Sequence, residues 1–172
     1  DYYRIPCRTL PAINTHSSRI LDVVPEVLEG TIVVGSRDLR KSPWGPGAEN
    51  PYDVFAHSKP VAKIGSYLVF RGRFETRLLS AISHVARARQ LAKGRRIEEA
   101  LTEAQEGLSA APESWVTHSG RAKVLHRAHR DTEAIAEYQE ALRLMQTTHP
   151  DYFYIQMGDV GREMAELQRR PN

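Results

Sequence analysis

Residues 81–110 read AISHVARARQLAKGRRIEEALTEAQEGLSA, and residues 115–144, displaced by 34 positions, read WVTHSGRAKVLHRAHRDTEAIAEYQEALRL. The same residue recurs at many aligned positions, in the pairs His84 and His118, Arg87 and Arg121, Ala88 and Ala122, Leu91 and Leu125, Arg96 and Arg130, Glu99 and Glu133, Ala100 and Ala134, and Glu103 and Glu137. Self-similarity at a fixed period of about 20 to 50 residues is typical of proteins built from stacked repeats. This stretch therefore decides the fold of the second half of the chain.

Residues that favour helices dominate the region from about Glu75 to Arg170. Two breaks that contain a proline, 111–113 and 147–150, divide this region, and a proline stops a helix or precedes a new one. We therefore predict two helical hairpins and a last helix. The last helix carries one apolar stripe, formed by Met157, Val160, Met164 and Leu167. We expect this stripe to cap the stack by covering the second hairpin.

The repeated residues resemble those of the tetratricopeptide repeat family, whose unit is a helix, a turn and a second helix. Ala88 and Ala122 match the small residue of the family's first helix, and Ala100 and Ala134 match that of its second. The resemblance implies a noncatalytic scaffold that binds a protein or peptide in a groove lined by the first helices.

The family's first-helix aromatic residue is replaced by His84 and His118. Because a histidine occupies this packing position twice, we expect both side chains in the core. Two repeats and a cap are fewer than the three or so repeats that usually stand alone. We therefore expect the N-terminal part of the chain to pack against the first helix.

The N-terminal part reads as strands and loops. Residues 30–35, GTIVVG, indicate a buried strand, and residues 60–71 indicate two strands that turn at Gly65 and Ser66. A proline- and glycine-rich loop lies between them, followed by a short helix over 52–56. The predicted fold class is α+β, with a small α/β domain over 1–74 and a helical domain of the tetratricopeptide type over 75–172.

Residues 29–36, Tyr52 and residues 59–70 are similar to the soluble C-terminal region of bacterial membrane glycosyltransferases related to protein mannosyltransferases and aminoarabinose transferases. The resemblance implies an accessory domain on the extracytoplasmic, periplasmic face of a membrane-embedded parent, with no catalytic residue in this chain. A start at Asp1, without an initiator Met, fits a piece of a longer protein. The alternative is a free-standing soluble adaptor, which would be cytoplasmic, that binds an acidic peptide or chain terminus. A small enzyme built on the N-terminal unit is a third possibility.

Basic and acidic residues separate between the two kinds of predicted helix. The first helices carry Arg87, Arg89, Lys93, Arg121, Lys123, His126 and Arg127. The second helices carry Glu98, Glu99, Glu103, Glu106, Asp131, Glu133, Glu137 and Glu140. Complementarity to the helix dipole explains charges near the helix ends. It does not explain Arg89 and Lys123, which lie inside their helices.

We therefore predict a basic groove for an acidic peptide, with Arg89, Ser119, Lys123 and His126 as its contacts. Two aromatic residues of the N-terminal loop, Trp44 and Tyr52, are further candidates for binding a partner, because their rings offer large faces. The alternative for both rings is that they form a small core within the loop.

Other functional classes find little support. A net charge of +3 and a pI near 9.1 are too weakly basic to favour nucleic acid as a partner. The single cysteine, Cys7, excludes an internal disulfide. The seven histidines show no metal-ligand spacing, and no nucleophile elbow or phosphate loop is present. We predict no catalytic residue, no metal and no cofactor. No apolar run approaches the roughly 18 residues that span a bilayer.

Overall fold

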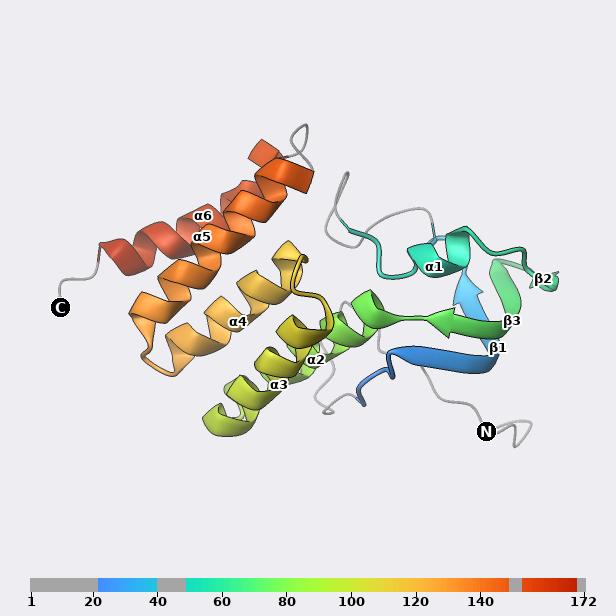
Figure 1. The fold of residues 1–172 in the computed structure, drawn as a ribbon, viewed down its shortest axis with the longest axis horizontal. Coiled ribbons are helices and arrows are strands. Elements are labelled where there is room, and N and C mark those ends of the chain that lie inside the picture. Colours follow the sequence, from blue (N-terminus) through green and yellow to red (C-terminus); the bar gives the residue numbers. More distant parts are fainter. Residues whose placement is uncertain (1–21, 40–48, 149–152, 170–172) are drawn as a thin grey trace.

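The computed structural model of the chain describes residues 22–39, 49–148 and 153–169. A three-stranded antiparallel sheet is followed by a stack of helices, which confirms the α+β prediction (Figure 1). The sheet has the order β1-β3-β2 and consists of β1 (Val27–Gly35), β2 (Ala62–Ile64) and β3 (Tyr67–Glu75). The helices are α1 (Asp53–Ala56), α2 (Arg77–Lys93), α3 (Ile97–Ala110), α4 (Trp115–Arg127), α5 (Asp131–Thr148) and α6 (Phe153–Gln168).

The sheet forms where the apolar, β-branched pattern indicates strands. Val33 pairs with Val69 across β1 and β3, and Tyr67 pairs with Ile64 across β3 and β2. The predicted turn lies at Gly65, whose φ of 59° suits a glycine. One face of the sheet, with α1, buries a core that includes the tilted rings of Phe55, Phe70 and Phe74.

The N-terminal unit packs against the start of α2, as predicted. Leu79 of α2 is buried in the core of the sheet. The backbone N–H of Val24 donates a hydrogen bond of 2.9 Å to the hydroxyl of Ser83, which is also on α2. Since only Thr76 separates β3 from α2, the sheet and the stack share a short connection as well as these buried contacts.

The helical stack repeats with the period seen in the sequence. α2 packs on α3, α4 packs on α5, and α2 also packs on α4 (Figure 1). Both hairpins end their first helix in the same way, because Arg95 and His129 have φ of 60° and 58°. The next residue in each turn, Arg96 or Arg130, donates its N–H over 3.0 Å to the carbonyl of Leu91 or Leu125.

Matched apolar residues are buried alike in the two hairpins. Ala88, Ala122, Ala100 and Ala134 have no exposed surface, and these small side chains let neighbouring helices approach closely. In α6, Val160 and Leu167 are buried in the same core as Tyr138, and Met164 packs against it. The predicted capping helix therefore covers the second hairpin, while the side chain of Met157 lies outside the described part.

The expectation that the two repeated histidines are core residues is wrong. His84 and His118 are partly exposed, and each Nδ1 lies 2.8 or 2.7 Å from a carboxylate oxygen of Glu103 or Glu137. Arg87 and Arg121 form ion pairs with the same two carboxylates. Each hairpin thus joins its first helix to its second by one polar cluster of a histidine, an arginine and a glutamate.

Candidate functional site

A pocket of about 280 Å³ opens between the second hairpin, its capping helix and α2. Its lining residues come from four helices and are Arg89, Ala92, Lys93, Lys123, Val124, His126, Arg127, Tyr138, Glu163, Glu166 and Leu167. Basic residues supply most of the charged groups, so the pocket has the character predicted for the groove.

The basic residues of the pocket occupy equivalent positions of the repeat. Arg89 of α2 and Lys123 of α4 are separated by 34 residues, and so are Lys93 and Arg127. The side chains line the pocket because neighbouring first helices, α2 and α4, pack side by side in the same orientation. A basic residue that recurs at the same position of α2 and α4 therefore appears twice on the surface that the two helices share.

Two of the basic residues have partners within the protein. Lys123 Nζ lies 3.0 Å from Glu163 of α6, and His126 Nδ1 lies 2.8 Å from Asp131 at the start of α5. Arg89, Lys93 and Arg127 are exposed and have no ion pair among the described residues. These three side chains are the ones most available to an incoming anion.

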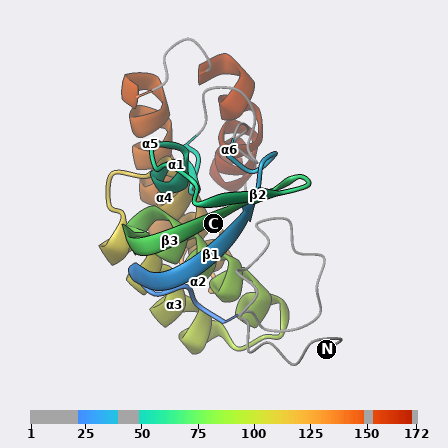
Figure 2. The ribbon, with the colours of Figure 1, turned by 90° about the vertical axis from the view of Figure 1, so that its right-hand side faces the viewer.

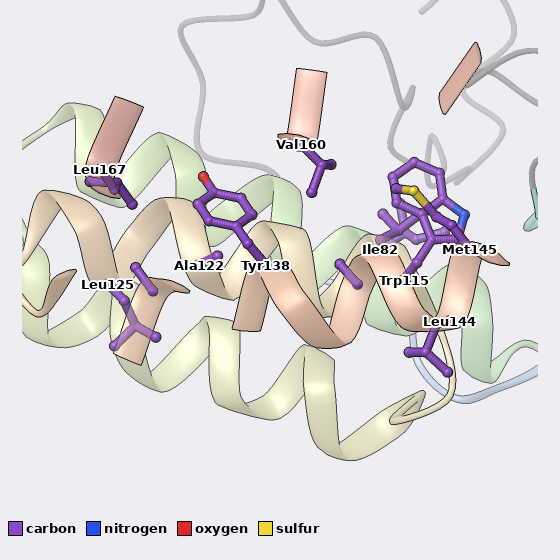
Figure 3. Close-up of a cluster of buried hydrophobic side chains, with 12 residues drawn as sticks. Ile82, Trp115, Ala122, Leu125, Tyr138, Leu144, Met145, Val160 and Leu167 are labelled. Atoms are coloured by element: carbon purple, nitrogen blue, oxygen red, sulfur yellow. The ribbon is translucent and has the colours of Figure 1, made fainter. Parts of the chain in front are cut away.

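The wall of the pocket is formed by Tyr138, which projects from α5 into the buried cluster shared with Val160 and Leu167 (Figure 3). Its hydroxyl donates a hydrogen bond of 2.6 Å to Glu163. Burial and the neighbouring carboxylate raise the pKa of Tyr138 above its ordinary value. The phenol therefore stays protonated and acts as a donor.

The Glu163 carboxylate accepts a hydrogen bond from the Tyr138 hydroxyl and forms an ion pair with the Lys123 ammonium. An internal carboxylate thus already occupies part of the basic pocket. Glu166, which is exposed and one turn along α6, adds a second negative charge to the lining. The pocket is therefore mostly basic but mixed in charge, whereas the sequence predicted a basic groove without these two glutamates.

The structure brings together three of the four groove residues predicted from the sequence, Arg89, Lys123 and His126. Ser119 does not belong to the pocket, because it is buried and its hydroxyl donates to the carbonyl of Val116 over 3.1 Å. Its role is packing within α4, where a small side chain fits and the backbone carbonyl satisfies the hydroxyl.

Of the two loop aromatics predicted for binding, Tyr52 does not line the pocket. Tyr52 packs against the core of the sheet, and burial there raises the pKa of its hydroxyl to about 12. The ring therefore belongs to the core of the sheet, whereas the alternative predicted from the sequence was a small core within the loop. Trp44 and Cys7 lie outside the described residues.

Sequence reasoning missed the contributions of α6 and Tyr138 to the pocket. The hydroxyl of Tyr138 faces Glu163, and the sequence alone gives no sign of this contact. The sequence of α6 offers one signal for this contribution, because Glu163 and Glu166 directly precede the apolar residues Met164 and Leu167. The sequence does not show whether these glutamates face the pocket, because that depends on how α6 packs on the second hairpin.

Within the ranges 22–39, 49–148 and 153–169, no three His, Cys, Asp or Glu residues gather in a way that could hold a metal ion. Among those same residues, no helix has the length and apolar character needed to cross a bilayer.

Comparison with protein-family models found no matching family, and comparisons with curated proteins and with solved structures found no significant match.

Proposed function

We propose that this chain is a noncatalytic protein-interaction scaffold of the tetratricopeptide type, whose basic pocket binds an acidic segment of a partner protein. The observation that carries the proposal is the convergence of Arg89 and Lys123, from equivalent positions of two hairpins, on one pocket. An extended acidic peptide has side chains at regular intervals, and a surface with regularly repeated cations is complementary to it.

The size and chemistry of the pocket fit one or two side chains better than a whole small-molecule substrate. A pocket of about 280 Å³ lies at the lower limit of ordinary ligand cavities, which hold about 300 to 1,000 Å³. Its polar groups include two glutamates, but basic side chains outnumber them, and Arg89, Lys93 and Arg127 are exposed, so carboxylates are the favoured ligands. Tyr138 and Leu167 add an apolar wall for a neighbouring side chain.

A direct test measures the binding of glutamate-rich peptides, displayed on an array and then titrated by fluorescence anisotropy. The test variant is Arg89→Glu with Lys93→Glu, because both side chains are exposed and their replacement leaves the core intact. The matched control is Lys59→Glu with Lys63→Glu, which makes the same change of charge beside β2.

We expect the pocket variant to lose roughly tenfold or more in affinity, and the control to stay within about twofold of the unchanged chain. Peptides in which glutamine replaces glutamate should not bind. Equal losses in the two variants would mean that net charge alone attracts the peptide, and unchanged binding in the pocket variant would exclude the pocket.

We also propose that the scaffold is attached to a membrane glycosyltransferase as an extracytoplasmic accessory region. The support is the resemblance of residues 29–36, Tyr52 and residues 59–70, and the strand β1 and the hairpin of β2 and β3 lie in this part of the chain. The full reading frame of the gene tests this: several hydrophobic spans before Asp1 are expected, and their absence would contradict the attachment. The chain would then be proposed as a free-standing adaptor, and the peptide assay would still test whether the pocket binds acidic peptides.

A further inference from the structure

The outer face of the sheet exposes apolar side chains that no element of the described chain covers. Val33, Val61, Ile64 and Tyr67 are 55%, 62%, 67% and 55% exposed, and they are the large apolar residues that stand out to solvent in the described ranges. Large exposed apolar patches mark sites of contact with proteins or membranes.

These residues gather at one end of the sheet, as the strand register shows. Val33 pairs with Val69, and Val69 pairs with Ala62 on its other side. In the next row of the same face, Tyr67 lies between Gly35 and Ile64. Alternate residues of a strand point to the same face, so these rows form one continuous apolar patch. We call it the hairpin patch, comprising Val33, Ala62, Ile64, Tyr67 and Val69.

The hairpin patch lies at the end of the molecule opposite to α5 and α6 (Figure 1). Viewed from that end, the strands lie in front of the helical stack (Figure 2). The helical pocket and the hairpin patch are therefore separate surfaces, and a ligand on one leaves the other free.

Four cations lie along the hairpin that carries the patch. Residues 59–73 contain Lys59, Lys63, Arg71 and Arg73 and no aspartate or glutamate. All four are exposed, and Arg71 lies in the row next to Val33 and Val69. Lys63 alternates with Ala62 and Ile64 and therefore lies on the other face of β2. Arg73 is paired with Glu75 at 3.8 Å. Glu29 is opposite Arg73, one row further from the patch.

We propose that the hairpin patch docks onto the surface of an anionic membrane. Ile64 and Tyr67 flank the projecting turn at Gly65 and enter the interface, and the cations of the hairpin contact the anionic headgroups. Tyrosine suits this position because its ring is apolar and its hydroxyl remains in the wet headgroup layer. A second copy of the chain fits less well, because a face-to-face dimer brings the cation Arg71, in the row beside the patch, close to like charges.

Co-sedimentation with vesicles tests the proposal, using vesicles of phosphatidylcholine alone and of phosphatidylcholine mixed with phosphatidylglycerol. We expect the unchanged chain to bind the mixed vesicles, to bind the neutral ones at least roughly tenfold more weakly, and to be released by salt. Failure to bind the mixed vesicles, or equal binding to both kinds, overturns the proposal.

Two variants of the hairpin separate its apolar and charged contributions. Ile64→Ser with Tyr67→Ser and Lys59→Glu with Lys63→Glu should each reduce binding to the mixed vesicles by roughly tenfold or more. The matched control is Arg89→Glu with Lys93→Glu, which should stay within about twofold. All of these side chains are exposed, and circular dichroism checks that each variant is folded.

An equal loss in the control would show that total charge, not the hairpin patch, attracts the vesicles, and would overturn the proposal. So would full binding by the serine variant. Analytical ultracentrifugation addresses the other occupant: a dimer of the unchanged chain that becomes a monomer in the serine variant would assign the patch to self-association. The peptide assay is independent of these outcomes.

Discussion

The imidazole of His118 is held between two hydrogen-bond acceptors. Its Nδ1 lies 2.7 Å from Glu137 and its Nε2 lies 2.8 Å from the carbonyl oxygen of Pro112, so the protonated ring donates to both. Burial lowers the pKa of His118, but these two hydrogen bonds outweigh it and leave the pKa above its ordinary value. Burial raises the pKa of Glu137, yet His118 and Arg121 outweigh it, and the net direction is downward.

This pair predicts a stability that depends on pH. The raised histidine pKa contributes stability below the unfolded value of 6.5, and this is lost as the pH rises through the folded pKa. The lowered glutamate pKa contributes above the unfolded value of 4.5, and this is lost as the pH falls through the folded pKa. In urea unfolding, His118→Gln should therefore cost more near pH 5.5 than near pH 8. A cost that stays constant or grows toward pH 8 would contradict the charged pair.

At the scale of residues, repetition made some side chains predictable. Arg89 and Lys123 were found because a cation recurs inside two helices, where the helix dipole does not explain it. Glu103 and Glu137 also recur with their histidines, but both histidines were expected in the core, so the polar clusters were not predicted. Ser119 was misplaced because the sequence does not show whether a serine hydroxyl bonds to its own helix. The pairing of Glu163 with Lys123 depends on how α6 docks.

The contact between α2 and α4 depends on a glycine. A Cβ built on Gly120 would overlap the side chain of Val85, which is buried on α2. The two first helices can therefore lie close enough to share the pocket only if this position carries no side chain. This packing is what places Arg89 and Lys123 on one surface.

Gly120→Ala should consequently lower the free energy of unfolding, although alanine favours a helix. Overpacking costs about 1 to 3 kcal/mol, and the gain in helix propensity offsets about 1 kcal/mol of that. Combining it with Val85→Ala removes the overlap, so Gly120→Ala should cost less, or stabilise, in the Val85→Ala background. Chemical denaturation of the four proteins measures this coupling, and purely additive costs would argue against the close approach.

The capping helix α6 competes with the proposed ligand. Because Glu163 accepts from Lys123 and Tyr138, an incoming carboxylate has to share or displace it. Glu163→Gln removes one negative charge from the pocket, and affinity for a glutamate-rich peptide should rise by about two- to fivefold. Glu106→Gln on the exposed side of α3 is the matched control and should have no effect. Weaker binding by Glu163→Gln in anisotropy titrations would reverse the assigned role of this carboxylate.

At the scale of elements, periodicity located the helices well. The break predicted at 111–113 separates α3 from α4, and the predicted turn at Gly65 separates β2 from β3. The start of the helical region was placed slightly early, because Glu75 continues the pairing of β3 with β1 and α2 begins at Arg77. Strand pairing is a tertiary effect that overrides the helix preference of single residues.

In the whole molecule, α2 joins the sheet to the helical stack, because it contributes to the cores of both. Phe70 is 1% exposed in the core of the sheet, and Leu79 of α2 is buried beside it in the same core. Phe70→Ala should cost about 3 to 5 kcal/mol. The helical signal in far-UV circular dichroism should be lost at lower denaturant concentration, in one transition. Tyr67→Ala, on the exposed face, should behave like the unchanged chain, and helices that unfold at the original midpoint in Phe70→Ala would show that the two parts are independent.

The central claim is that cations repeated on α2 and α4 make one pocket for acidic segments. Nuclear magnetic resonance titration of the ¹⁵N-labelled chain with a glutamate-rich peptide tests it most directly, because each amide reports its own surroundings. We predict shifts that saturate at amides around Arg89, Lys93, Lys123 and Arg127 and at the α6 residues near Glu163, with β1, β2 and β3 unchanged. Shifts confined to the sheet, or none at millimolar peptide, would contradict the claim.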